Sequence, residues 1–133
     1  MPFKKFDFSL CYTNGYIFVI GGKQSVDDVV NTCEMYNVKD NYWKSIAPCN
    51  YERYAATAVG TKSGHIFLFG GRSPYENQIL NSIEEYTMKT NTWKVVQIKG
   101  ETPWLPVEVC GAIQVGDKEL MIFGGSDYRI KDS

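Results

Sequence analysis

The chain has 133 residues, 15 acidic and 14 basic, so its formal net charge is −1 and no strong field would attract nucleic acid or an anionic membrane. Aromatic residues make up 14% of the chain, and with twelve glycines and short apolar runs this favours β-strands joined by frequent turns. The runs 16–20 and 66–69 are too short to cross a bilayer, and no signal-peptide core precedes them, so we expect a cytoplasmic protein.

The first predicted element is a β-hairpin. Its strands, 6–13 and 16–20, flank Asn14-Gly15, a dipeptide that supplies the positive φ angles of a type I′ turn. The second strand, YIFVI, is apolar on both faces, so a sheet that contains it needs cover on both sides. A double glycine, Gly21-Gly22, ends the hairpin.

Two further strands complete the first unit. A polar loop, 23–30, leads into a third strand at 32–38 that should end near Tyr36. The polar segment 37–41 then turns the chain, so that a fourth strand at 42–46 can run back. The sequence therefore predicts a four-stranded antiparallel sheet.

A second unit follows the same plan, and a third begins it. The second unit contains strand 54–59, a turn at 60–64, strand 65–69, a double glycine and the loop 72–80. The third unit contains strand 109–115, strand 120–123 and a double glycine, after which the pattern stops. No Glu-x-Tyr and no following Trp come after that last glycine pair.

The units are copies of one repeat. The stretch 31–44 (NTCEMYNVKDNYWK) returns as 81–94 (NSIEEYTMKTNTWK), with seven of fourteen positions identical. Chance identity at one position is roughly one in fifteen to twenty, so this match indicates an internal repeat. The predicted units are residues 6–46, residues 53–98 and an incomplete third at 107–125.

An apolar strand that ends in Gly-Gly, then Glu-x-Tyr, then Trp seven residues on, resembles the kelch repeat, the blade of a kelch β-propeller. The residues that carry the resemblance are Gly21, Gly22, Glu34, Tyr36 and Trp43, then Gly70, Gly71, Glu84, Tyr86 and Trp93, and finally Gly124 and Gly125. The resemblance implies an all-β fold, a partial kelch-type propeller with about 2.5 four-stranded antiparallel blades.

We expect these signature residues to be structural. The glycines allow backbone angles and close approaches that other residues cannot adopt, and the Tyr and Trp rings can fill the wedge between neighbouring sheets. Glu34 and Glu84 should accept hydrogen bonds from backbone N–H groups or from Tyr, because an unpaired carboxylate in that wedge would be costly.

The chain has too few repeats to close a kelch propeller into a ring by itself. Kelch propellers close with about five to seven blades, and this chain supplies about half of that number. Its open ends would expose apolar sheet faces. We expect a fragment of a larger propeller, with self-association through the open blade edges as the alternative.

The resemblance also implies a function. Similar kelch proteins bind peptide segments with residues just after the double glycine and at the start of each innermost strand, so we predict a non-catalytic scaffold or adaptor for a protein or peptide partner. The corresponding residues here, with one neighbouring loop tyrosine, are Lys23, Arg72, Ser126, Tyr54, Glu108 and Tyr75. Arg and Tyr are residue types that anchor interfaces.

The rival function is that of a kelch-type propeller enzyme, an oxidase or a sugar-modifying enzyme. A mononuclear copper site of that kind draws on more than one His, and this chain has only His65. The sequence separates no nucleophile and base pair from scattered polar residues. We therefore predict no catalytic residue, no metal site and no cofactor.

The four cysteines, Cys11, Cys33, Cys49 and Cys110, have no metal-ligand spacing and are expected to be reduced and mostly buried. An alternative is a redox sensor through an exposed Cys49 beside Pro48. That alternative lacks a resolving cysteine at close sequence spacing.

Overall fold

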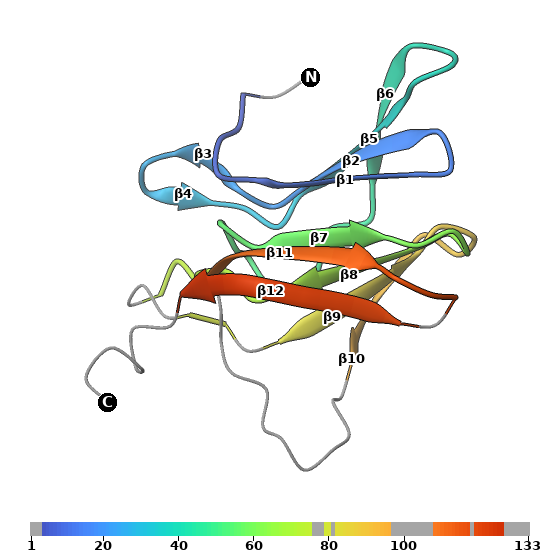
Figure 1. The fold of residues 1–133 in the computed structure, drawn as a ribbon. Helices are drawn as coiled ribbons and strands as arrows, with labels where there is room; N and C mark the ends of the chain where they lie inside the picture. The colour runs from blue at the N-terminus through green and yellow to red at the C-terminus, as the bar shows by residue number, and fades with distance from the viewer. Residues whose placement is uncertain (1–3, 76–78, 81, 97–107, 118, 127–133) are drawn as a thin grey trace.

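The computed structural model describes residues 4–75, 79–80, 82–96, 108–117 and 119–126 (Figure 1). The regular secondary structure in these ranges consists of β-strands, which confirms the predicted all-β fold. None of them contains a helix that is long and apolar enough to cross a membrane.

The first blade is a four-stranded sheet in the order β1-β2-β5-β6, with every neighbouring pair antiparallel. Its strands are β1 (Ser9–Thr13), β2 (Tyr16–Ile20), β5 (Cys33–Asn37) and β6 (Tyr42–Ile46). Between β1 and β2, Asn14 and Gly15 have φ angles of 53° and 86°, which confirms the predicted type of tight turn.

The second blade has the same plan, with the order β10-β9-β8-β7. Its strands are β7 (Thr57–Gly60), β8 (His65–Phe69), β9 (Ile83–Thr87) and β10 (Thr92–Val96). The third unit contributes one antiparallel pair, β11 (Glu108–Gln114) and β12 (Leu120–Ser126). Its double glycine lies within β12, where Gly124 is the ladder partner of Cys110.

The innermost strands begin three residues later than predicted, at Ser9 and Thr57. The reason is a positive φ angle of 54° at both Asp7 and Ala55, which bends the backbone out of the extended form just before each strand. The same bend occurs at the same place in both blades. It belongs to the repeat, although the side chains there are different.

The loop at 23–30 is also more ordered than predicted, because it contains a short hairpin of β3 (Lys23–Ser25) and β4 (Asp28–Val29). Val29 is buried, and the N–H of Val30 donates to the carbonyl of Gly22 at 2.9 Å. The β3–β4 pairing, the buried Val29 and this backbone bond together fold the segment.

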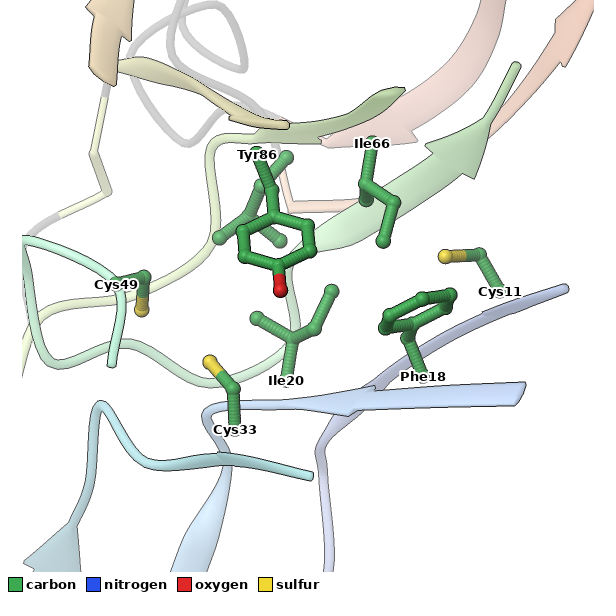
Figure 2. Close-up of a cluster of buried hydrophobic side chains, with 8 residues drawn as sticks. Cys11, Phe18, Ile20, Cys33, Cys49, Ile66 and Tyr86 are labelled. Atoms are coloured by element: carbon green, nitrogen blue, oxygen red, sulfur yellow. The ribbon is translucent and has the colours of Figure 1, made fainter. Parts of the chain in front are cut away.

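The blades stack face to face, with β7 between β1 and β11 (Figure 1). A hydrophobic cluster fills the space between the first and second blades (Figure 2). Its buried members are Cys11, Phe18, Ile20, Cys33, Cys49, Ile66, Leu68 and Tyr86. The Tyr86 and Phe18 ring centroids are 6.0 Å apart, so Tyr86 fills the wedge between blades as predicted.

A second cluster joins the second blade to the third unit. Val59, Phe69 and Ile83 are buried there, and Ala112 and Leu120 pack against them. The innermost strands β1, β7 and β11 border a hollow of about 500 Å³. The blades are thus stacked with their innermost strands, β1, β7 and β11, side by side along one edge.

The first two double glycines have the positive φ angles that were expected of them. Gly71 has a φ angle of 87°, and a Cβ atom on it would lie 2.7 Å from the Tyr54 carbonyl oxygen. Gly21 has a φ angle of 61°, and a Cβ atom there would lie 2.7 Å from the Arg53 carbonyl oxygen. A side chain at either position would therefore meet backbone, which cannot move aside cheaply.

We predict that Gly71→Ala lowers the free energy of unfolding by about 2–4 kcal/mol, because strain at positive φ adds to the clash with Tyr54. Gly15→Ala is the matched control, since Gly15 has a similar φ angle of 86° but no atom within 4 Å of the place that a Cβ atom would occupy. It should cost about 1–2 kcal/mol. Urea unfolding measures both, and equal costs would contradict the close-approach explanation.

Candidate functional site

A buried ion pair fixes the connection between the two blades. Arg53 Nη2 lies 2.7 Å from Glu84 Oε2, and both side chains are fully buried. Arg53 Nη1 also donates to the carbonyl of Gly70 at 2.8 Å. Glu84 Oε1 accepts from the backbone N–H of Asn50 at 2.6 Å and from its side-chain amide at 2.8 Å. The Arg53–Glu84 pair therefore ties the chain after β6 to strand β9, and through Arg53 to Gly70.

In the first blade, Lys5 pairs with Glu34. Its ammonium nitrogen lies 2.8 Å from Glu34 Oε2 and 2.9 Å from the carbonyl oxygen of Thr32. Glu34 Oε1 is buried and has no hydrogen-bond partner in the part of the chain that the structure describes. Each signature glutamate thus has its own buried cation, Lys5 or Arg53, but the two differ in what meets the second carboxylate oxygen.

The predicted partners of the glutamates were correct in part. Backbone donors were expected, and Glu84 has them. Of the two kinds of donor that were expected, tyrosine is not the one used, because the hydroxyl groups of Tyr86 and Tyr36 donate to the side-chain oxygens of Asn91 and Asn41. The two buried cations were missed, although each precedes its glutamate by about thirty residues, a spacing that the repeat could have revealed.

Three of the predicted partner-binding residues come together at one end of the blades. Tyr54 and Arg72 form a backbone bridge, with N–H···O distances of 3.1 and 2.8 Å. The ammonium nitrogen of Lys23 lies 3.8 Å from the centroid of the Tyr54 ring, a cation–π contact. A cavity of about 140 Å³ lies here, lined by Lys23, Val26, Asp27, Val29, Tyr54, Ser73 and Pro74. We call this cavity and the Lys23–Tyr54 contact the loop rim.

The other predicted residues differ in their placement. Tyr75 is 73% exposed and follows the cavity residues Ser73 and Pro74. Arg72 is buried, and its backbone bridge to Tyr54 forms part of the rim. Glu108 and Ser126 face each other as ladder partners at the ends of β11 and β12, and their side chains lie outside the described residues.

His65 belongs to a different place in the fold. Its Nδ1 lies 2.8 Å from Glu85 Oε1, on the side of the second blade that faces the third unit. A cavity of about 490 Å³ adjoins this pair, and the hydroxyl groups of Thr61 and Ser63 on its wall are hydrogen-bonded to each other at 2.9 Å. In the described ranges, no group of three or more His, Cys, Asp or Glu residues could hold a metal ion.

Four-stranded antiparallel blades, stacked with their innermost strands adjacent and their loops gathered at one end, define the β-propeller class of repeat protein. A family model described as the KLHDC2/KLHL20/DRC7 Kelch-repeats domain matches residues 2–132. The chain belongs to the kelch-repeat family.

Individual relatives are consistent with this membership. Kelch-like protein 41a of Danio rerio is 33% identical over 95 residues, which is 71% of this chain and 15% of that protein. Kelch-like protein 38 of Rattus norvegicus is 30% identical over 86% of this chain and 19% of its own length. Kelch-like protein 36 of Rattus norvegicus is 29% identical over 98% of this chain and 21% of its own length. The chain thus spans about a fifth or less of these relatives.

We predict that Glu84→Gln lowers the free energy of unfolding by about 3–5 kcal/mol, because it leaves the fully buried charge of Arg53 without its counter-ion. Glu85→Gln is the matched control on the same strand. Its side chain is 22% exposed and its partner His65 33% exposed, so the loss should be about 0–1 kcal/mol.

Urea unfolding of both variants and the wild type measures the difference. Equal losses would mean that the buried pair does not hold the blades together.

Proposed function

We propose that this chain is a non-catalytic protein-interaction module whose partner binds at the loop rim. The observation that carries the proposal is the contact of the Lys23 ammonium with the Tyr54 ring, at a cavity formed by loops of both blades. A partner that binds there touches both repeats at once. The family relationship supports protein binding in general, and the rim residues supply the particular surface.

The chemistry of the rim fits a peptide segment. Tyr54 is half-buried and held by its backbone bridge, so its ring offers apolar area at little entropic cost. Lys23 and Asp27 line the same cavity with opposite charges, which can orient polar groups of a peptide. The net charge of −1 gives no general attraction for nucleic acid or an anionic membrane.

We also propose a cytoplasmic location for this module. The thiols of Cys11, Cys33 and Cys49 are free and buried, which supports a reducing compartment. The non-catalytic assignment has a simple test of its own, since an oxidase assay and metal analysis of the purified chain should both be negative.

Peptides selected on the wild-type chain from a random-peptide phage library provide the test of the rim. We predict that Lys23→Ala and Tyr54→Ala each weaken the affinity of the selected peptides at least tenfold, because each variant breaks the pair at the centre of the rim. Tyr75→Ala should also weaken binding, since Tyr75 is exposed and directly follows the cavity residues Ser73 and Pro74 in the chain. Fluorescence anisotropy with labelled peptides measures the affinities.

Lys39→Ala is the matched control, because Lys39 is an exposed lysine in the β5–β6 turn, at the opposite end of the blade. It should leave the affinity unchanged. If all variants bind as tightly as the wild type, the rim is not the binding site.

We further propose that the chain is part of a larger propeller, in which another blade covers the free face of the first blade. In the second blade, Tyr86 is 2% exposed beneath the first blade, and Trp93 Nε1 donates to the carbonyl of Ala47 at 2.8 Å. The corresponding Tyr36 and Trp43 have the same ring geometry, with centroids 5.0 Å apart in each pair. Tyr36, however, is only half-buried.

The chemistry of the missing cover can be inferred from the repeat. The first blade meets the second with an apolar face and with backbone groups from the segment 47–51. The free face of the first blade offers apolar groups such as Leu10 and Val38, which are 58% and 48% exposed. Glu34 Oε1, in the same blade, is buried and has no hydrogen-bond partner among the described residues. A further kelch blade, with a loop like 47–51, matches each of these groups.

Tyrosine truncation tests this second proposal. We predict that Tyr86→Ala costs about 3–5 kcal/mol, as for other large buried aromatic side chains, and that Tyr36→Ala costs less than half as much in the 133-residue chain. In a longer gene product, with the sequence on both sides read from the genome, the two costs should become equal.

Equal costs in the 133-residue chain would instead mean that the face is already covered. Sedimentation equilibrium would then show whether self-association through the open blade edges is the cause.

A further inference from the structure

Two buried thiols meet beside the connection between the first and second blades. Cys33 opens β5, and Cys49 lies three residues after β6. Each is only 1% exposed. The Cys33 and Cys49 sulfurs lie 3.4 Å and 3.6 Å from the same acceptor, the carbonyl oxygen of Asn31. Figure 2 shows both on one side of the cluster, with Cys11 on the other.

Asn31 holds this arrangement in place. Its carbonyl accepts from the backbone N–H of Cys49 at 3.0 Å, and its side-chain amide donates to the carbonyl of Cys49 at 2.9 Å. The backbone of Cys49 is therefore fixed against the chain that leads into β5. The exposed Cys49 considered from the sequence is wrong, but the partner thiol that seemed to be missing is present in space.

The two thiols are chemically unequal. The hydrogen bond from Cys49 lowers the pKa of Cys33, while that same bond and burial raise the pKa of Cys49. For Cys11, burial alone raises the pKa, to about 12. Cys33 is thus the thiol suited to attack, and Cys49 is the one placed to resolve.

We propose that Cys33 and Cys49 are an oxidative modification site, at which a low-molecular-weight disulfide such as glutathione disulfide converts the thiol pair to a reversible disulfide. The Cys33 thiolate attacks one sulfur of the oxidant, and a mixed disulfide forms as one thiolate leaves. Cys49 then loses its proton and attacks the Cys33 sulfur, which releases the second thiol. Two protein thiols and one disulfide become one protein disulfide and two small thiols.

Access to the pair requires local opening. Cys49 lies in the segment between β6 and β7, which contains no strand longer than an isolated bridge, so local opening around Cys49 breaks no strand ladder of either blade. The repeat itself does not require these thiols, because the position of Cys33 in the first blade is occupied by Ile83 in the second. A thiol pair at this place is therefore a property of the first blade alone.

The disulfide would strengthen the junction between the blades. The segment that follows β6 contacts the second blade through Ala47, Asn50 and Arg53. A bond from Cys49 to β5 would tie this segment to the first blade and restrict the unfolded chain. Oxidised protein should therefore melt several degrees above reduced protein.

The test equilibrates the reduced 133-residue chain with graded ratios of reduced to oxidised glutathione. Samples are taken both folded, in urea below the unfolding midpoint, and during refolding from full denaturation, so that access does not limit the reaction. After alkylation and tryptic digestion, mass spectrometry should find peptide 24–39, which contains Cys33, linked to peptide 45–53, which contains Cys49. The linked mass should be two hydrogens below the sum of the free peptides.

Variants separate this proposal from non-specific oxidation. Cys33→Ser and Cys49→Ser should each abolish the linked peptide and the rise in melting temperature, whereas Cys11→Ala should keep both. The proposal fails if the pair stays reduced at the most oxidising ratio after refolding. It also fails if Cys33 or Cys49 links mainly to another cysteine, or if the linked protein melts no higher than the reduced form.

Discussion

The Glu84 carboxylate, buried against Arg53, is the interaction on which the arrangement of the two blades depends. A carboxylate that is buried away from water needs hydrogen-bond donors around it. Glu84 has donors from Arg53, Asn50 and Tyr51, all in the segment that follows the first blade. Because Arg53 also binds the carbonyl of Gly70, the same group fixes the turn of the second blade. One carboxylate thus sets the path of three segments that are far apart in the sequence.

The two blades have the same internal structure, but their glutamates have different surroundings. Both blades contain the same Tyr–Trp pair and the same buried glutamate, but among the described residues a neighbouring blade packs over those of the second blade alone. Among the described residues, Glu34 Oε1 has no hydrogen-bond partner, whereas Glu84 Oε1 accepts from two donors. In a stacked repeat, stability comes from the interface with the next unit as much as from the unit itself.

The arrangement of the blades also determines which non-repeated side chains come into contact. The positive φ angles at Asp7 and Ala55 bring the residues before each innermost strand against the residues after the double glycine. Tyr54 and Lys23 meet there, although they belong to different blades. The thiols of Cys33 and Cys49 likewise come together because the backbone path brings them to one place, beside the connection that Glu84 and Arg53 hold.

The sequence by itself determined the repeat, the strand order within each blade and the structural role of its glycines and aromatic rings, because these follow from local backbone angles and from the alternation of side chains along strands. Strand β2 and strand β6 have the predicted bounds, Tyr16–Ile20 and Tyr42–Ile46. Only the tertiary structure decided that Lys5 and Arg53 are the buried cations and that Cys49 is buried beside Cys33. These pairs join residues 16 to 31 positions apart in loops and strand ends, and no local pattern encodes which of several polar or thiol groups the packing of two sheets will enclose.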